Sequence, residues 1–192
     1  MPGMLFDANG DGSADIINTG DGGANTVSQV YYNNTHTPAD LLSSITLPTG
    51  GTTTVSYKMT EQYKDGSGNL LNPKLLFNLA TVSQITTNDG NGNISTTSYS
   101  YEKGYYFFNS VLDRKFSGFN KVTTTDAASN VTTTFYHEGN SSDSSMGESN
   151  DDEWKMGKPY RVEIANSSGN IYSKTINKWD DVDLGNGSKF VK

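Results

Sequence analysis

The feature that most constrains this fold is a repeated unit of turn and strand. Three copies lie between residues 89 and 179: DGNGNISTTSYSY, DAASNVTTTFYH and NSSGNIYSKTINKW. In each copy a polar turn is closed by Asn93, Asn130 or Asn170, and Ile or Val then opens a Thr/Ser-rich strand that carries aromatic residues. A weaker copy, DGSGNLL, closes its turn at Asn69. Repeats spaced 37 and 40 residues apart predict stacked β-hairpin units, each burying its face on the next.

Strand patterns outside the repeats indicate the same architecture. SSITLPTGGTTTVSYKM predicts a hairpin, because Ile45 and Leu47 share one face and PTGG supplies turn residues. Apolar and charged residues alternate in KPYRVEIA, as in a half-exposed antiparallel strand. LLNPKLLF is apolar, but Pro73 excludes a central strand position. We therefore expect that segment to be a loop packed over the sheet.

Composition narrows the class of protein further. Hydrophobic residues make up only 33% of the 192 residues, whereas aromatic residues reach 11%, with 11 Tyr. Tyr, Thr, Val and Ile suit a pleated, half-buried surface, so we expect an all-β protein with a thin core. The net charge of −7, with 14 basic residues scattered among 21 acidic ones, argues against nucleic-acid binding. No apolar run is long enough for a membrane span, no signal peptide is evident, and without cysteine there is no disulfide framework.

The segment DANGDGSAD near the N-terminus has the spacing of a calcium loop. Oxygen ligands at alternate positions of a tight loop converge on one point, and hard oxygen ligands favour Ca²⁺. The loop matches the first nine positions of an EF-hand loop, but its twelfth position is Asn and no amphipathic helix follows. It resembles instead the calcium loop of FG-GAP or integrin-type β-propeller blades. An empty polar turn is the alternative. The candidate ligands are Asp7, Asn9, Asp11, Ser13 and Asp15.

Several polar features bear on catalysis. Residues 138–153, EGNSSDSSMGESNDDE, are acidic and Ser-rich and predict a flexible loop. His137 lies in a Thr/Tyr strand, where histidine is usually a surface or cross-strand residue, and His36 falls in a loop. The carboxylate runs NDDEW and WDDVD sit in polar surroundings, where carboxylates are expected to be solvated. No triad or phosphate loop is evident, so we predict a non-enzyme.

A succession of segments carries a family resemblance. DLLSSITLPTGGTTTVSY, TTNDGNGNISTTSYSYEKGYY, LDRKFSGFNKVTTTD and MGKPYRVEIANSSGNIYSKTINKW follow in this order. They resemble the middle region of SpvB/TcB-type toxin-complex and Rhs/YD-repeat proteins, over about residues 4–180. DRKFSGFNKV is similar to the REF-x-GF signature, with Arg114, Phe116, Gly118 and Phe119 in place. It departs at Lys115, where an acidic residue is expected.

The resemblance implies a structural role in virulence. In that family the repeats wind into a hollow β-shell around a toxic C-terminal region, and the proteins are secreted or delivered to the bacterial surface. We therefore expect an excised or truncated segment that starts inside the last propeller blade. Its expected parts are a calcium-loop remnant, 1–27, and a β-hairpin repeat region forming an open, shell-like sheet, 28–192. Expected partners are the remainder of the parent shell or other toxin-complex subunits.

Two other classes of function stay open at this point. A surface adhesin-like or carbohydrate-binding β-module requires exposed aromatic residues around GYYFF, 104–108, or Trp179, whereas buried ones favour a scaffold. A glycosidase requires two facing carboxylates in a cleft and an ordered loop near Asp151. A shell fragment leaves strand edges unpaired, so we also expect self-association through sheet edges.

Overall fold

The computed structural model describes residues 3–9, 13–18, 29–33, 40–185 and 189–191. Strands account for 52% of the structure and helices for 5%. The helical part consists of the short 3-10 turns η1 (Thr60–Gln62), η2 (Ser144–Met146) and η3 (Glu153–Lys155). The prediction of an all-β, antiparallel fold is confirmed. Within the described ranges, none of these helices has the length or the apolar character needed to cross a membrane.

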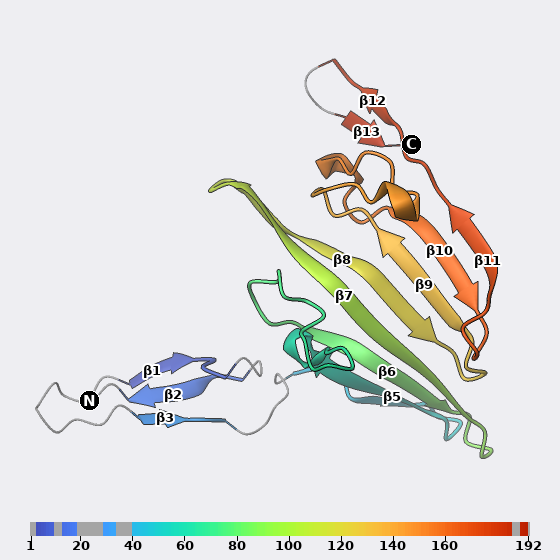
Figure 1. The fold of residues 1–192 in the computed structure, drawn as a ribbon. Coiled ribbons are helices and arrows are strands. Elements are labelled where there is room, and N and C mark those ends of the chain that lie inside the picture. The colour runs from blue at the N-terminus through green and yellow to red at the C-terminus, as the bar shows by residue number, and fades with distance from the viewer. Residues whose placement is uncertain (1–2, 10–12, 19–28, 34–39, 186–188, 192) are drawn as a thin grey trace, which may run out of the picture.

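The main element is an eight-stranded antiparallel sheet with the order β11-β10-β9-β8-β7-β6-β5-β4 (Figure 1). Strands adjacent in sequence are adjacent in the sheet, so the topology is a simple meander. Its strands are β4 (Ser44–Thr46), β5 (Thr52–Met59), β6 (Ala80–Asn88), β7 (Ile94–Ser110), β8 (Asp113–Thr125), β9 (Val131–Tyr136), β10 (Pro159–Ala165) and β11 (Ile171–Ile176). The predicted hairpin of SSITLPTGGTTTVSYKM is the pair β4–β5.

The repeated turns are the hairpin connections of this sheet. They join β6 to β7, β8 to β9 and β10 to β11, as the repeat predicted. In the second turn the Asp126 carboxylate accepts hydrogen bonds from the backbone N–H of Ala128 (2.9 Å) and Asn130 (2.8 Å). It also accepts one from Asn130 Nδ2 (3.0 Å). The Asp carboxylate thus closes a five-residue turn locally, and the same pattern recurs in turns 65–69 and 89–93.

The connection between β5 and β6, residues 60–79, packs over the sheet as expected. Tyr63 meets Tyr101 of β7 edge-on at 5.8 Å between ring centroids, and Phe77 meets Tyr106 in the same way. The prolonged strand β7 extends beyond its pairing with β6, which ends at Ser98. The connection therefore supplies partners for the part of β7 that β6 does not reach.

Two smaller sheets flank the meander in sequence. The first contains β1 (Gly3–Phe6), β2 (Asp15–Asn18) and β3 (Gln29–Tyr31), and the second contains β12 (Asp181–Asp183) and β13 (Lys189–Val191). Because β3 pairs with β2, the first sheet includes residues on both sides of the boundary predicted after residue 27. That boundary itself lies outside the described residues.

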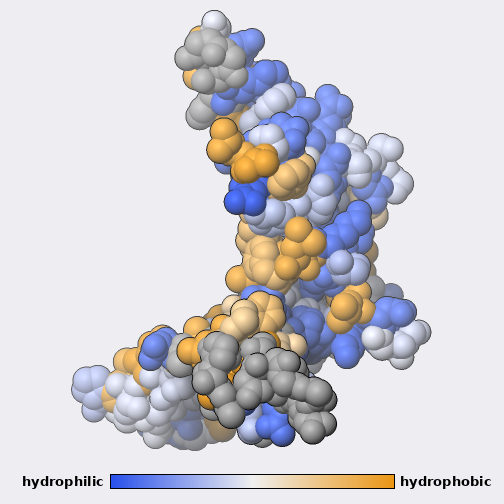
Figure 2. All heavy atoms as spheres, turned by 90° about the vertical axis from the view of Figure 1, so that its left-hand side faces the viewer, coloured by the Kyte–Doolittle hydropathy of each residue, from blue (hydrophilic) through white to orange (hydrophobic). Residues whose placement is uncertain are grey.

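The core is thin, because most of the sheet is a single layer. The accessible surface is 11993 Å² for a mass of 20.8 kDa, against about 8,900 Å² for a compact monomer of this size. Figure 2 shows hydrophobic residues gathered over the middle and lower parts of one face. Among the described residues, 25 large hydrophobic side chains are exposed. The buried apolar residues are Met59, Tyr63, Phe135, Tyr160 and Ala165.

Candidate functional site

The predicted calcium loop connects β1 to β2, so strands rather than helices flank it. Asp15 is fully buried, and its two carboxylate oxygens accept backbone hydrogen bonds from Ala8 (2.8 Å) and Asn33 (2.8 Å). Ser13 is buried, Asp7 is half-buried and Asn9 is exposed. The remaining predicted ligand, residue 11, lies outside the described residues. In this structure Asp15 ties the loop to the sheet, and calcium binding stays a prediction.

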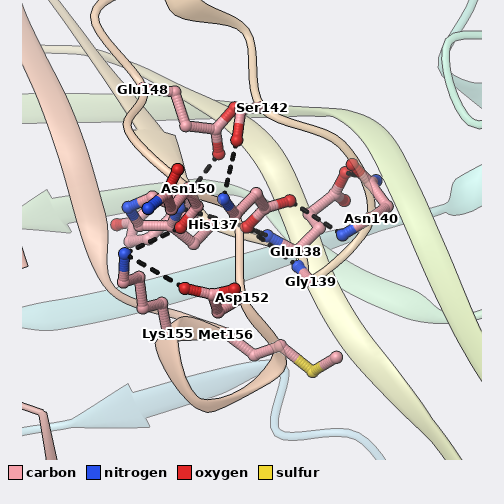
Figure 3. Close-up of polar contacts among 12 residues, drawn as sticks. His137, Glu138, Gly139, Asn140, Ser142, Glu148, Asn150, Asp152, Lys155 and Met156 are labelled. Carbon is pink, nitrogen blue, oxygen red and sulfur yellow. Dashed lines mark hydrogen bonds and ion pairs between the residues drawn. The ribbon is translucent and has the colours of Figure 1, made fainter. Parts of the chain in front are cut away.

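A second polar cluster lies in the connection that follows β9. His137 follows β9 directly, and its backbone is fixed by hydrogen bonds with Gly157 and Lys158, the two residues that precede β10. Its Nδ1 atom lies 3.0 Å from Glu148 Oε1 and 3.1 Å from Asp151 Oδ1. All three side chains are 1–2% exposed. The three ligand-type atoms lie within 4.8 Å of one another. Figure 3 shows His137 and Glu148 among the surrounding polar residues.

Asp151 is held by backbone donors from the other side of the loop. Its Oδ1 accepts from the N–H groups of Glu138 (3.1 Å) and Gly139 (3.0 Å), and its Oδ2 accepts from Asn140 (2.8 Å). Three successive N–H groups converging on a carboxylate form an anion-binding concavity of the kind called a nest. The Asp151 backbone N–H in turn donates to Ser142 Oγ at 2.7 Å. These bonds fix the position of Asp151 independently of His137.

Glu148 is fixed through only one of its two oxygens. Its Oε2 accepts a hydrogen bond from the Asp143 backbone N–H at 2.7 Å. Its Oε1 is buried without a hydrogen bond, although it lies 3.0 Å from His137 Nδ1. The hydrogen bond of that nitrogen is made with Asp151 instead. The cluster therefore contains a buried carboxylate oxygen that points at the imidazole without being satisfied.

Glu138 adds a further carboxyl group to this region. It is 4% exposed; its Oε2 accepts from Asn140 Nδ2 at 3.0 Å, and its Oε1 has no partner. Burial raises the pKa of Glu138 to about 8, because removing the carboxylate from water disfavours its charged form. The pKa of Glu138 therefore differs from that of an ordinary solvated glutamate.

The pKa values of His137 and Asp151 are shifted by their mutual contact. Burial alone lowers the pKa of His137, but its contacts with the carboxylates of Asp151 and Glu148 outweigh that effect, and the net shift is upward. Burial alone raises the pKa of Asp151, and the bonds from His137, Asn140 and Gly139 outweigh it, so the net shift is downward. Both shifts favour the charged pair.

A cavity of about 470 Å³ reaches this cluster. Glu138 and Glu148 form part of its wall, and Lys74, Lys103 and Asn120 contribute from neighbouring elements. His137 itself does not line the cavity, and its ring packs against the buried Tyr160 with 5.2 Å between centroids. The cavity thus gives access to the carboxyl groups of Glu138 and Glu148, whereas neither His137 nor Asp151 forms part of its wall.

Sequence reasoning missed this cluster. His137 was expected to be a surface or cross-strand residue, and the carboxylates of NDDEW were expected in water. A surface position is wrong for His137 and solvation is wrong for Asp151, because each side chain is 1% exposed. The usable signal was the length of the connection, since a loop of more than about 15 residues between paired strands is usually functional or disordered. Residues 137–158 are such a connection.

Some of the aromatic residues singled out from the sequence are packed against other side chains, and others are exposed. Tyr106 contacts Phe77, whereas Phe108 is 58% exposed at the far end of β7. Trp179 is half-buried, and its Nε1 donates to the Pro159 carbonyl at 2.9 Å. A tryptophan anchored to the backbone in this way supports packing more than ligand stacking.

The fold and this site define an all-β chain built as one long antiparallel meander, with an internal polar cluster and no helical layer among its described residues. Residues 3–142 match the family model described as "Insecticide toxin TcdB middle/N-terminal region". The chain belongs to this family of toxin-complex proteins. No curated protein and no solved structure matches the chain. The matched stretch includes His137 and Glu138 but ends before Glu148 and Asp151.

Proposed function

We propose that this chain is a non-catalytic structural segment of a bacterial Rhs/TcB-like toxin shell, which scaffolds the encapsulation or delivery of a downstream toxin. The family is defined by a region of a toxin rather than by an activity. The observation that carries the proposal is the open, single-layered sheet, whose apolar side chains are mostly only half-buried, together with the exposed large hydrophobic side chains of the described residues. Large exposed apolar surfaces mark places where other protein packs.

The free edges of the sheet support the same proposal. Within the described residues, β11 has a neighbour only on the side of β10, and all six of its residues are exposed. Such an edge presents unpaired backbone groups that template the addition of another strand. The rest of the parent shell, other toxin-complex subunits or a second copy of this sheet would extend it there.

The remaining parts of the proposal follow from the resemblance. A parent of this kind is secreted or displayed on the bacterial surface, and the loop with the candidate ligands Asp7, Asn9, Asp11, Ser13 and Asp15 is a structural Ca²⁺ site left from an FG-GAP-like propeller. A surface adhesin-like or carbohydrate-binding module is the second candidate. The exposed side chains of Phe108 and Tyr172 favour it, because exposed aromatic rings can stack on ligands.

The edge of β11 offers a direct test in the parent protein. The Asn177 N–H donates to the Tyr160 carbonyl, and ladder bonds alternate along an antiparallel pair. The N–H of Thr175 therefore faces β10, whereas the N–H of Lys174 faces the free edge. Lys174→Pro removes an outward donor without breaking the sheet.

The readout is protection of the downstream toxin region from protease. We expect Lys174→Pro to reduce that protection and Lys174→Ala, which keeps the N–H, to leave it unchanged. Thr175→Pro provides the opposite control, because it should unfold the β10–β11 hairpin itself. Unchanged protection in Lys174→Pro, together with saturable binding on a glycan array, would contradict the scaffold and favour the binding module.

A further inference from the structure

We propose that His137, Glu148 and Asp151 form a binding site for one divalent transition-metal ion, such as Mn²⁺ or Zn²⁺. The ligand atoms are His137 Nδ1, Glu148 Oε1 and Asp151 Oδ1. An imidazole nitrogen with two carboxylate oxygens suits first-row divalent ions, whereas Ca²⁺ prefers a shell made of oxygen alone. The site is separate from the predicted calcium loop in sequence and in ligand chemistry.

The spacings from the His137 nitrogen to each of the two carboxylate oxygens fit a common metal centre. Two ligands bound at about 2.1 Å lie about 3.0 Å apart at a right angle and about 3.4 Å apart at a tetrahedral angle. The nitrogen lies 3.0 Å from the Glu148 oxygen and 3.1 Å from the Asp151 oxygen. These distances match ligands at right angles, as in six-coordinate geometry. The remaining positions then belong to water from the adjoining cavity, which Glu148 helps to line.

The unsatisfied oxygen of Glu148 is the independent sign of a ligand. A buried acceptor without a partner is costly, and native structures rarely keep one without a reason. One imidazole N–H cannot donate well to two carboxylate oxygens, and the hydrogen bond of His137 Nδ1 is made with Asp151. A metal ion at the meeting point would satisfy the nitrogen and both oxygens together.

Charge balance points the same way. The side chains of His137, Glu148 and Asp151 are each buried, and among these three only the histidine can carry a positive charge. Lys155 is also buried, but its Nζ donates to the carbonyls of Ser149 and Asn150 and faces Asp152. Buried carboxylates are stable when paired or when they bind a cation, and a divalent ion offsets two of them.

The outer contacts hold the ligands in place before an ion arrives. Asp151 is fixed by three backbone N–H groups, and Glu148 is fixed through its other oxygen by the Asp143 N–H. Such outer-shell bonds orient metal ligands and tune their affinity. The Tyr160 ring against His137 excludes water from the inner side.

The test is titration of the purified chain with Mn²⁺ and with Zn²⁺ by calorimetry, with thermal melting alongside. We expect one equivalent to bind and, at a hundredfold excess over the dissociation constant, the melting temperature to rise by about 5–10 °C. Glu148→Gln keeps the acceptor for the Asp143 N–H but loses an anionic ligand, and binding should weaken at least tenfold. Asp152→Asn, the same kind of change beside the site, should bind like the parent chain.

Imidazole NMR provides a readout that needs no variant. The chain has two histidines, so their ring nitrogens are easily told apart. One equivalent of Zn²⁺ should shift the His137 Nδ1 resonance and leave His36 unchanged. Absence of saturable binding, equal affinity in Glu148→Gln, or an unshifted His137 nitrogen would each overturn the proposal. Ca²⁺ displacing Mn²⁺ with equal affinity would also do so.

Discussion

Replacement of Asn72 tests the packing of the 60–79 connection on the sheet. Asn72 is 6% exposed, and its Oδ1 accepts a hydrogen bond from the Gly104 N–H at 2.8 Å. Its Nδ2 donates to the carbonyls of Tyr101 (3.0 Å) and Thr60 (3.3 Å). The side chain thereby replaces a neighbouring strand along the part of β7 that β6 does not reach.

The size of the effect follows from these three bonds. Each bond contributes about 1 kcal/mol net, and a buried group left without a partner costs about 1–3 kcal/mol. We therefore expect Asn72→Ala to lower the free energy of unfolding by about 3 kcal/mol or more. For a chain of this length, that corresponds to a fall of about 6–12 °C in melting temperature. Urea unfolding followed by circular dichroism measures the free energy directly.

Asn72→Asp separates hydrogen bonding from lost volume. The substitution keeps the shape but turns the donor into an oxygen that faces two carbonyl oxygens, so it should destabilise at neutral pH at least as strongly as alanine. Asn91→Ala removes an exposed turn side chain and should change stability by less than about 0.5 kcal/mol. The reasoning fails if both Asn72 variants stay within 0.5 kcal/mol of the parent chain.

Three further predictions concern the turns and the N-terminal loop. Ser129 has a φ of 64° at a position that is glycine in the other three repeat turns. Ser129→Gly should raise the free energy of unfolding by about 0.5–1 kcal/mol in urea melts, and a loss of stability would show that the serine side chain matters. The pKa of Asp126 is lowered, first by the Asn130 side-chain hydrogen bond. The stabilisation from this bond is present above the ordinary Asp pKa of about 4 and is lost as the pH falls through the lowered pKa. Asp126→Asn should therefore flatten the acid limb of a stability–pH curve, and an unchanged limb would argue against this role of Asp126. Calcium titration should raise the melting temperature of the parent chain but not of Asp11→Ala, and binding retained in that variant would remove Asp11 from the ligand set.

The repeat shows how far local sequence can determine structure. An Asp or Asn followed by Asn four positions later closes its turn within five residues, and the Thr-rich strands beside it pair with their neighbours in the chain. All of these interactions are local, so the hairpins, their antiparallel order and the all-β class could be predicted from the residues alone. The loop over the sheet was also predictable, because Pro73 cannot occupy a central strand.

The histidine–carboxylate cluster depended on the tertiary structure. His137, Glu148 and Asp151 are polar residues in a Ser- and Asn-rich stretch, and their composition alone indicates a solvated loop. They are buried because β9 and β10 pair side by side and the connection between them folds back onto Tyr160. Burial and the convergence of side chains depend on distances through space. The sequence by itself therefore determined the hairpins, and only the tertiary structure decided which polar groups lost their water.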